Sequence, residues 1–313
     1  MSFPTPTAKY HHEPTSAVDP TQERLSAAGK TVLVTGGGTA IGAATVEAFA
    51  KARADHIFLI GRRLNLLKAV EQKVSVQNST PRTPAGPDIL QLAKQYPNTK
   101  FHPIQTDLSK EDQVKDLFQQ INKVSFLDIL VANAGYLPEP GPLASSETAE
   151  WWKGHEINVL GTYLLGKYFL NQSQPARGKP VFVGVNTGAA HMGPAAGPMS
   201  GYVSSKLAAA SVVEFLQAEN PNIKAFNVSP GIVKSDMADK ANMPHLPPQD
   251  SPELMANFAV WLAGPESDFL SGRFLWANWD VEELVAAKDK IEANPGLLHL
   301  TLEGWWNNFS SLK

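Results

Sequence analysis

The feature that most constrains the fold is a repeated alternation of short apolar runs with longer stretches of helical spacing. The apolar runs cover residues 31–34, 56–60, 101–105, 129–132, 181–185, 223–228 and 274–276. The helical stretches cover 41–52, 64–76, 110–123, 151–170, a segment from about 202, and 254–263. Because the runs are apolar throughout, they indicate strands buried on both faces. The sequence predicts a doubly wound α/β fold, with a mostly seven-stranded parallel sheet and helices on both faces.

The ends of the chain do not follow this alternation. Residues 1–28 are polar and contain proline, and they predict a flexible or surface-hugging arm before a single domain over 29–280. Residues 281–313 form a C-terminal extension, and residues 78–88 read as a loop. The adjacent His11 and His12 could bind a metal, but a solvated pair is the favoured interpretation.

Composition excludes several functions. The net charge is −3, and no run of basic residues exceeds Arg62-Arg63, so nucleic acid and anionic membranes are not expected partners. The absence of cysteine rules out disulfides and thiolate chemistry, and we predict no metal site. No apolar run has the length of a signal peptide or a membrane span, so we expect a soluble, cytoplasmic protein.

A glycine-rich turn, from Thr35 to Gly42, lies between the first strand and the first helix. A Rossmann-like dinucleotide fold places its phosphate-binding turn there, because glycines let the backbone approach a pyrophosphate at a helix N-terminus. The order is T-G-x-x-x-G-x-G with Ala40 in place of one glycine. The cofactor-binding residues expected in the turn are Gly36, Gly38, Thr39 and Ile41.

The end of the second strand favours NADP(H) over NAD(H). An NAD site usually has an acid there, whereas this chain has Arg62 and Arg63, and the nearby Asp55 precedes the strand. The planar donor fork of Arg62 suits a 2′-phosphate. The alternative is that both arginines are solvated residues at a helix start. Asp107 and Leu108 follow the third strand and are expected near the adenine.

Tyr202 and Lys206 are four residues apart and share one face if the segment is helical. An ammonium near a phenol favours the phenolate and lowers its pKa, so Tyr202 could exchange a proton with a carbonyl or alcohol oxygen. This spacing also arises by chance at solvated helix edges, so the pair is informative only together with other motifs.

These segments together resemble the short-chain dehydrogenase/reductase family from about residue 30 to residue 280. The resemblance rests on six motifs in the family's order, which are 35–42, 106–108, 132–135, 158–161, Tyr202-x-x-x-Lys206 and 228–231. It implies that Tyr202 is the general acid/base and that Lys206 holds the ribose and lowers the pKa of Tyr202. It also implies that Asn158 orders a water in the proton relay.

The same resemblance assigns further residues. Asp107, Leu108 and Asn133 would line the adenosine half of the cofactor. Beside the nicotinamide it places Pro230, Ile232, Val233 and Ser235. Thr187 stands where the family has a serine and keeps a hydroxyl for the substrate oxygen, with Asn186 as an alternative donor.

The expected activity is NADPH-dependent reduction of a ketone or aldehyde, reversibly oxidation of a secondary alcohol, on a moderately hydrophobic small molecule. Loops 188–200 and 236–250 would select that substrate. The alternatives are a non-catalytic NADP(H)-binding regulator or scaffold and an NAD-dependent alcohol dehydrogenase. A homodimer or higher homo-oligomer is expected through the two long helices, whereas the C-terminal extension puts the family's common tetramer contact in doubt.

Overall fold

The structure is a computed structural model, which describes residues 5–68, 89–176, 178–242 and 249–301. Its centre is a seven-stranded sheet in the order β3-β2-β1-β4-β5-β6-β7, and every pairing is parallel. The strands are β1 Thr31–Thr35, β2 His56–Gly61, β3 Lys100–Gln105, β4 Ile129–Ala132, β5 Val181–Val185, β6 Lys224–Ser229 and β7 Phe274–Trp276. The predicted doubly wound, seven-stranded parallel fold is confirmed.

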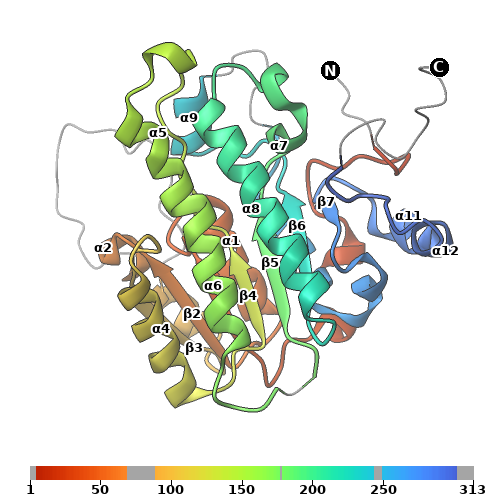
Figure 1. Cartoon of the computed structure of the whole chain (residues 1–313). Coiled ribbons are helices and arrows are strands. Elements are labelled where there is room, and N and C mark those ends of the chain that lie inside the picture. The colour runs from red at the N-terminus through yellow and green to blue at the C-terminus, as the bar shows by residue number, and fades with distance from the viewer. Residues whose placement is uncertain (1–4, 69–88, 177, 243–248, 302–313) are drawn as a thin grey trace.

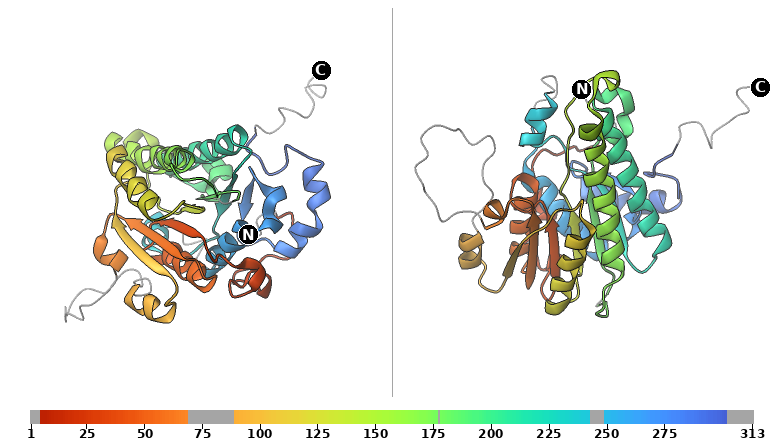
Figure 2. Two further views of the ribbon diagram at one scale, coloured as in Figure 1. Left: turned by 90° about the horizontal axis from the view of Figure 1, so that it is seen from below. Right: turned by 60° about the vertical axis from the view of Figure 1, so that its left-hand side comes forward.

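Helices cover both faces of the sheet (Figures 1 and 2). The helices are α1 Ala40–Lys51, α2 Leu64–Lys68, α3 Ile89–Gln95, α4 Glu111–Val124, α5 Thr148–His155, α6 Gly161–Leu170, α7 Ala189–Met192, α8 Ser200–Glu219, α9 Asp236–Ala241, α10 Pro252–Ala263, α11 Val281–Ala286 and α12 Lys288–Glu292. Alternate residues of one strand enter opposite cores: Val32 and Val34 pack on the side of α1 and α10, and Leu33 packs on the side of α4 and α6. This is why the runs read as continuously apolar.

Several helices differ from the sequence expectation. The helix predicted over 64–76 is described only as α2, and its remainder and the loop 78–88 lie outside the described residues. The long helix predicted over 151–170 begins earlier, at Thr148, because the carboxylate of Glu147 caps it. It contains one turn of π-helix over Glu156–Leu160. The short helices α3, α11 and α12 were not predicted. None of the described helices is both long and apolar enough to cross a membrane.

The N-terminal arm and the C-terminal extension pack against the domain. Val18 and Leu25 of the arm and Leu284 of the extension are buried in the core on the α1 and α10 side. The free edge of β7 is covered as well, because the Phe274 amide donates to the Leu298 carbonyl at 2.7 Å. Tyr10 forms an antiparallel bridge with Trp279, just after β7.

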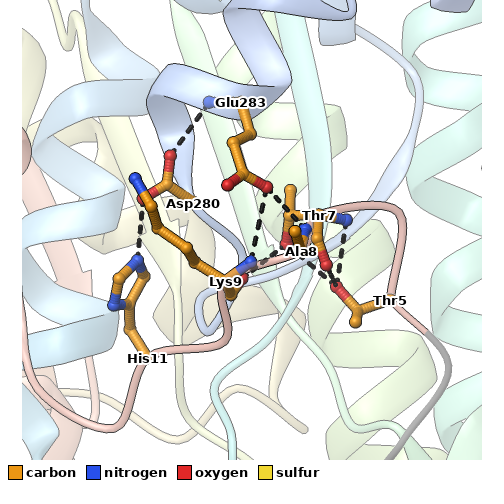
Figure 3. A network of polar contacts seen from close by, with 7 residues as sticks. All are labelled: Thr5, Thr7, Ala8, Lys9, His11, Asp280 and Glu283. Carbon is orange, nitrogen blue, oxygen red and sulfur yellow. Dashed lines mark hydrogen bonds and ion pairs between the residues drawn. The ribbon is translucent and has the colours of Figure 1, made fainter.

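The histidine pair is exposed to solvent only in part, and both rings have carboxylate partners. His11 is half-buried and bonds Asp280 at 2.8 Å, whereas His12 stays exposed and bonds Asp250 at 2.5 Å, and both carboxylates are buried. Within the described residues no group of three or more His, Asp or Glu side chains is placed to hold a metal ion. The carboxylate partners were not predicted because they lie more than 230 positions further along the chain. Figure 3 shows the bond between His11 and Asp280.

Candidate active site

A cavity of about 340 Å³ opens at the carboxyl ends of the strands. Parallel α/β sheets bind ligands at this edge. Most predicted cofactor residues line it: Gly36, Gly38, Thr39, Ile41, Arg62, Asp107, Leu108, Asn133, Tyr202, Lys206, Pro230 and Ser235. Thr187, Asn158, Ile232 and Val233 are not part of its lining.

The glycine turn at one end of this cavity is shaped by close backbone contacts. Gly36 has a φ of +67°, and a Cβ on Gly42 would lie 2.0 Å from the Gly36 carbonyl oxygen. The Asn133 amide donates to the Thr35 carbonyl at 2.8 Å and fixes the turn to the end of β4. Ala40, which replaces a glycine of the pattern, keeps a left-handed φ of +45°. The glycines therefore leave backbone surface open towards the cavity.

Positive charge dominates the end of β2. Arg62 and Arg63 are exposed and line the cavity, whereas Asp55 lies at the opposite end of the strand and accepts from the Gly29 amide. Burial would raise the pKa of Asp107, but hydrogen bonds from Ser109 and the charge of Arg62 outweigh burial and lower it. Asp107 is thus an ionised carboxylate at the adjacent strand end.

Tyr202 and Lys206 lie on α8 and are both buried. The Tyr202 hydroxyl is hydrogen-bonded to Thr187, and burial raises the pKa of Tyr202 to about 12, although the Thr187 bond opposes the rise. The Lys206 ammonium donates to the Val185 carbonyl at 2.9 Å, and burial lowers its pKa to about 8. The expected lowering of the Tyr202 pKa by Lys206 is absent, because burial is the larger effect and Lys206 is directed to the backbone.

Asn158 lies in the π-helical turn, and its buried side chain connects two elements. Its carbonyl oxygen accepts from the Tyr136 amide at 2.8 Å, and its amide donates to the Tyr136 carbonyl at 2.8 Å and to the Ser205 hydroxyl at 2.9 Å. Ser205 directly precedes Lys206. Asn158 therefore ties the segment after β4 to α8 at Ser205.

The segment after β6 bends around the carboxylate of Asp250, which lies 18 positions after Ile232. Pro230 and Ser235 line the cavity, but the Ile232 amide donates to Asp250 at 2.5 Å and Val233 is buried. Ser235 also caps α9, accepting from the Ala238 amide at 3.1 Å. Asp250 was not among the residues chosen from the sequence, since no motif marks it.

Other residues that line the cavity were not assigned to the cofactor from the sequence, although Asn186 was expected as an alternative donor to the substrate and Arg63 was noted beside Arg62. They are Thr35, Ala40, Ile60, Gly61, Arg63, Leu66, Leu67, Thr106, Ala134, Gly135, Ile157, Val185, Asn186, Asp236 and Met237. Several of them stand at strand ends, and that position in a parallel sheet is a signal that could have identified them.

A second cavity, of about 380 Å³, lies on the other side of Tyr202. It is lined by 138–142, 145–147, 150–151 and 198–202. A small apolar cluster of Leu137, Ala196, Met199 and Tyr202 lies beside it, with Met192 and Met237 packed against the cluster. Part of loop 188–200 therefore borders this region as expected, whereas residues 243–248 of the other predicted loop lie outside the described residues.

Comparisons with known proteins agree with this geometry. A family model described as short chain dehydrogenase matches residues 83–245. The short chain dehydrogenase mpl6 of Monascus purpureus is 34% identical over 270 residues, which is 84% of this chain and 85% of that protein. The short chain dehydrogenase/reductase AacuD of Aspergillus aculeatus is 28% identical and spans 96% of this chain and 98% of its own length.

Solved structures share the fold. A short chain dehydrogenase from Shigella flexneri, complexed with NADP, superposes with a TM-score of 0.69 at 21% identity, covering 82% of this chain and 99% of that chain. The RhlG/NADP active-site complex of Pseudomonas aeruginosa gives a TM-score of 0.66 at 23% identity, covering 82% and 97%.

Proposed function

The chain belongs to the short-chain dehydrogenase/reductase family of NAD(P)-dependent oxidoreductases, and on that premise we propose that it reduces a ketone or aldehyde with NADPH, reversibly oxidising the alcohol. One observation carries the proposal: Tyr202 lines both cavities, and its hydroxyl is bonded to the Thr187 hydroxyl. A proton donor between the cavity at the glycine turn and a second, partly apolar cavity suits hydride transfer coupled to proton transfer.

Gly36, Gly38 and Thr39 line the cavity just before α1, where a pyrophosphate would meet the helix N-terminus. Gly42 lets the turn close, because an added methyl group there would collide with the Gly36 carbonyl. When bound, the nicotinamide supplies the hydride that reduces the carbonyl carbon. The residues that would hold this cofactor include Asn133 and Asp107 in the adenosine half and Pro230 and Ser235 in the nicotinamide half.

In our proposal the chain supplies the proton. The raised pKa keeps Tyr202 protonated at neutral pH, so it is available as an acid to the carbonyl oxygen. The Thr187 hydroxyl would hydrogen-bond the same oxygen and orient it. Lys206 would hold the ribose hydroxyls. Asn158 would hold α8 in position through its hydrogen bond to the Ser205 hydroxyl.

The preference for NADPH rests on the end of β2. Arg62 is an exposed guanidinium on the cavity, and the carboxylates that line the cavity, Asp107 and Asp236, belong to other segments. A 2′-phosphate would gain charge-assisted hydrogen bonds there, whereas the ribose 2′-hydroxyl of NAD would lack its usual acid. NADP in the Shigella flexneri structure is consistent with this choice.

The apolar cluster beside the second cavity supports a moderately hydrophobic substrate. Met192, Met199 and Met237 are adaptable side chains that fit irregular apolar ligands. The polar Tyr202 and Thr187 hydroxyls then fix only the reacting oxygen.

We also propose that two copies of the chain associate. Exposed apolar side chains lie along α5, the π-helical turn and α6, with others on α8; examples are Trp152, Tyr163, Leu207 and Phe215. Monomers rarely expose such rows. Sedimentation of a Phe215→Glu variant tests the proposal: loss of the dimer is expected, and a wild type that sediments as a monomer would contradict it.

The activity is tested by following NADPH oxidation with a panel of apolar ketones and aldehydes, with Tyr202→Phe as the matched control. We expect turnover by the wild type and almost none by the variant, while both bind NADPH. NADPH binding by the wild type without oxidation across the panel would overturn the reductase proposal.

A further inference from the structure

The segment after β6 forms one wall of the cofactor cavity and is held by the buried carboxylate of Asp250. One oxygen of Asp250 accepts from the Ile232 amide at 2.5 Å. The other accepts from the Asn278 side chain at 2.9 Å and bonds His12 Nδ1 at 2.5 Å. Since a carboxylate only accepts, His12 Nδ1 is the donor. Asp250 therefore joins the loop, the segment after β7 and the N-terminal arm.

The loop is closely fitted to this carboxylate. Gly231 has a φ of +82°, and a Cβ at this position would lie 2.4 Å from an Asp250 oxygen. The Ile232 carbonyl accepts from the amides of Gln249 and Asp250 at 3.0 and 3.2 Å. Pro230, just before this contact, and Ser235, just after it, line the cavity. A shift of Asp250 would therefore move the cavity wall.

The arm is fixed at His12 and at residues that precede it. The Ser251 amide donates to the His12 carbonyl at 2.9 Å, and His11 exchanges hydrogen bonds of 2.8 Å with Asn278. Further along the arm, His11 bonds Asp280 at 2.8 Å and the Ala8 amide donates to Glu283 at 2.5 Å (Figure 3). The backbone bonds of His11 and His12 hold the His12 ring against Asp250, whereas the His11 side chain and Ala8 anchor the arm at other residues.

We propose that His12 and Asp250 are positioning residues, through which the N-terminal arm sets the geometry of the cofactor-binding wall at 230–235. The inference rests on the proposed function in one respect: carbonyl reduction is the reaction whose rate reports the position of this wall. His12 and Asp250 are not part of the cavity lining, so they act through Ile232 and its neighbours.

Three variants separate positioning from stabilisation of the fold. His12→Ala removes the donor to Asp250. His12→Asn restores it, because the asparagine amide nitrogen can take the place of Nδ1. His11→Ala is the matched control. It also breaks a histidine–carboxylate pair of the arm, but the carboxylate is that of Asp280 and not that of Asp250.

We expect His12→Ala to lower kcat/KM for the carbonyl by about 10- to 100-fold, the range that a small displacement near reacting groups produces. His12→Asn should recover most of the loss. His11→Ala should keep kcat/KM near the wild-type value even if both alanine variants melt at the same lowered temperature.

The positioning role is overturned if His12→Ala and His11→Ala lower the melting temperature alike while His12→Ala leaves kcat/KM and NADPH affinity unchanged. NADPH affinity, followed by nicotinamide fluorescence, separates this result from failure of the proposed function. If the wild type binds NADPH but reduces no carbonyl, the reductase proposal fails. The positioning role then stands if His12→Ala weakens binding and His12→Asn restores it, and fails otherwise.

Discussion

The two halves of the cofactor cavity are built in different ways. The half at β1 to β3 is shaped by backbone: Gly36 and Gly42 fix a turn within eight residues of sequence, and Arg62 stands exposed beside it. The half at β4 to β7 is shaped by buried side chains, in which Tyr202 and Lys206 of α8 depend on partners at the end of β5 and just after it. We expect the first half to determine the affinity for the cofactor and the second half to determine the rate of the reaction. Variants in the first half should change the Kd for NADPH, and variants in the second half should change kcat.

The largest effect is expected in the second half. Tyr202→Phe should lower kcat by about 10²- to 10⁴-fold, because it removes the positioned proton donor. NADPH affinity, measured by fluorescence titration, should change little. Retention of a tenth or more of the wild-type kcat would show that another group supplies the proton, and the contrast between the two halves would be lost.

Lys206→Met tests the cost of a buried charge. The pKa of Lys206 in the folded protein is about 8, below its ordinary value of 10.5. Below pH 8 the folded protein holds a desolvated ammonium, which lowers the free energy of unfolding. This destabilisation decreases as the pH rises above 8, where the folded protein loses the proton, and it is gone above pH 10.5, where the unfolded chain has lost the proton too. The free energy of unfolding of Lys206→Met should exceed that of the wild type by about 2 kcal/mol at pH 7, and this difference should be smaller at pH 10.

Denaturant unfolding at both pH values measures this difference. Lys110→Met is the control, since Lys110 is exposed. A gain in stability that is equal at pH 7 and pH 10 would contradict the assigned cause. The loss of the hydrogen bond to Val185 offsets part of the gain at either pH.

In the first half, Arg62→Asp should raise the Kd for NADPH about 10-fold, the lower range for loss of a charge-assisted hydrogen bond at an exposed site. NADH affinity should improve, and kcat at saturating NADPH should stay near the wild-type value. Arg63→Asp makes the same charge change one residue later and should have the weaker effect. Unchanged NADPH affinity in Arg62→Asp would refute the assignment.

The smallest effect is expected at Ala40, which has a left-handed φ of +45°. Ala40→Gly removes a conformational penalty of about 1–2 kcal/mol and adds an entropic cost of about 0.5–1 kcal/mol. A small net gain, seen as a rise of about 1–2 °C in Tm, is expected. Ala44→Gly, within α1, should instead lower the Tm. A lower Tm in Ala40→Gly would mean that the strain is absent.

The same contrast explains what the sequence could predict. All seven strands and the glycine turn were predicted, because apolar runs and glycine spacing are local patterns. The pKa of Tyr202 was not, since it depends on how deeply α8 is buried. The partners of His11 and His12 were missed because nothing near these residues indicates Asp280 or Asp250.

The distance between His12 and Asp250 in the chain also has a consequence for folding. They are 238 positions apart in a chain of 313 residues, so this contact closes most of the chain into a loop. Contacts of such separation form late, after more local structure has offset the entropy of closure. During synthesis the arm emerges before the strands of the domain, yet its docking site is complete only after β7 and α11 have been made. Docking of the first residues would then be a late event of folding, and a truncated chain that ended before residue 250 would leave the arm without its partners.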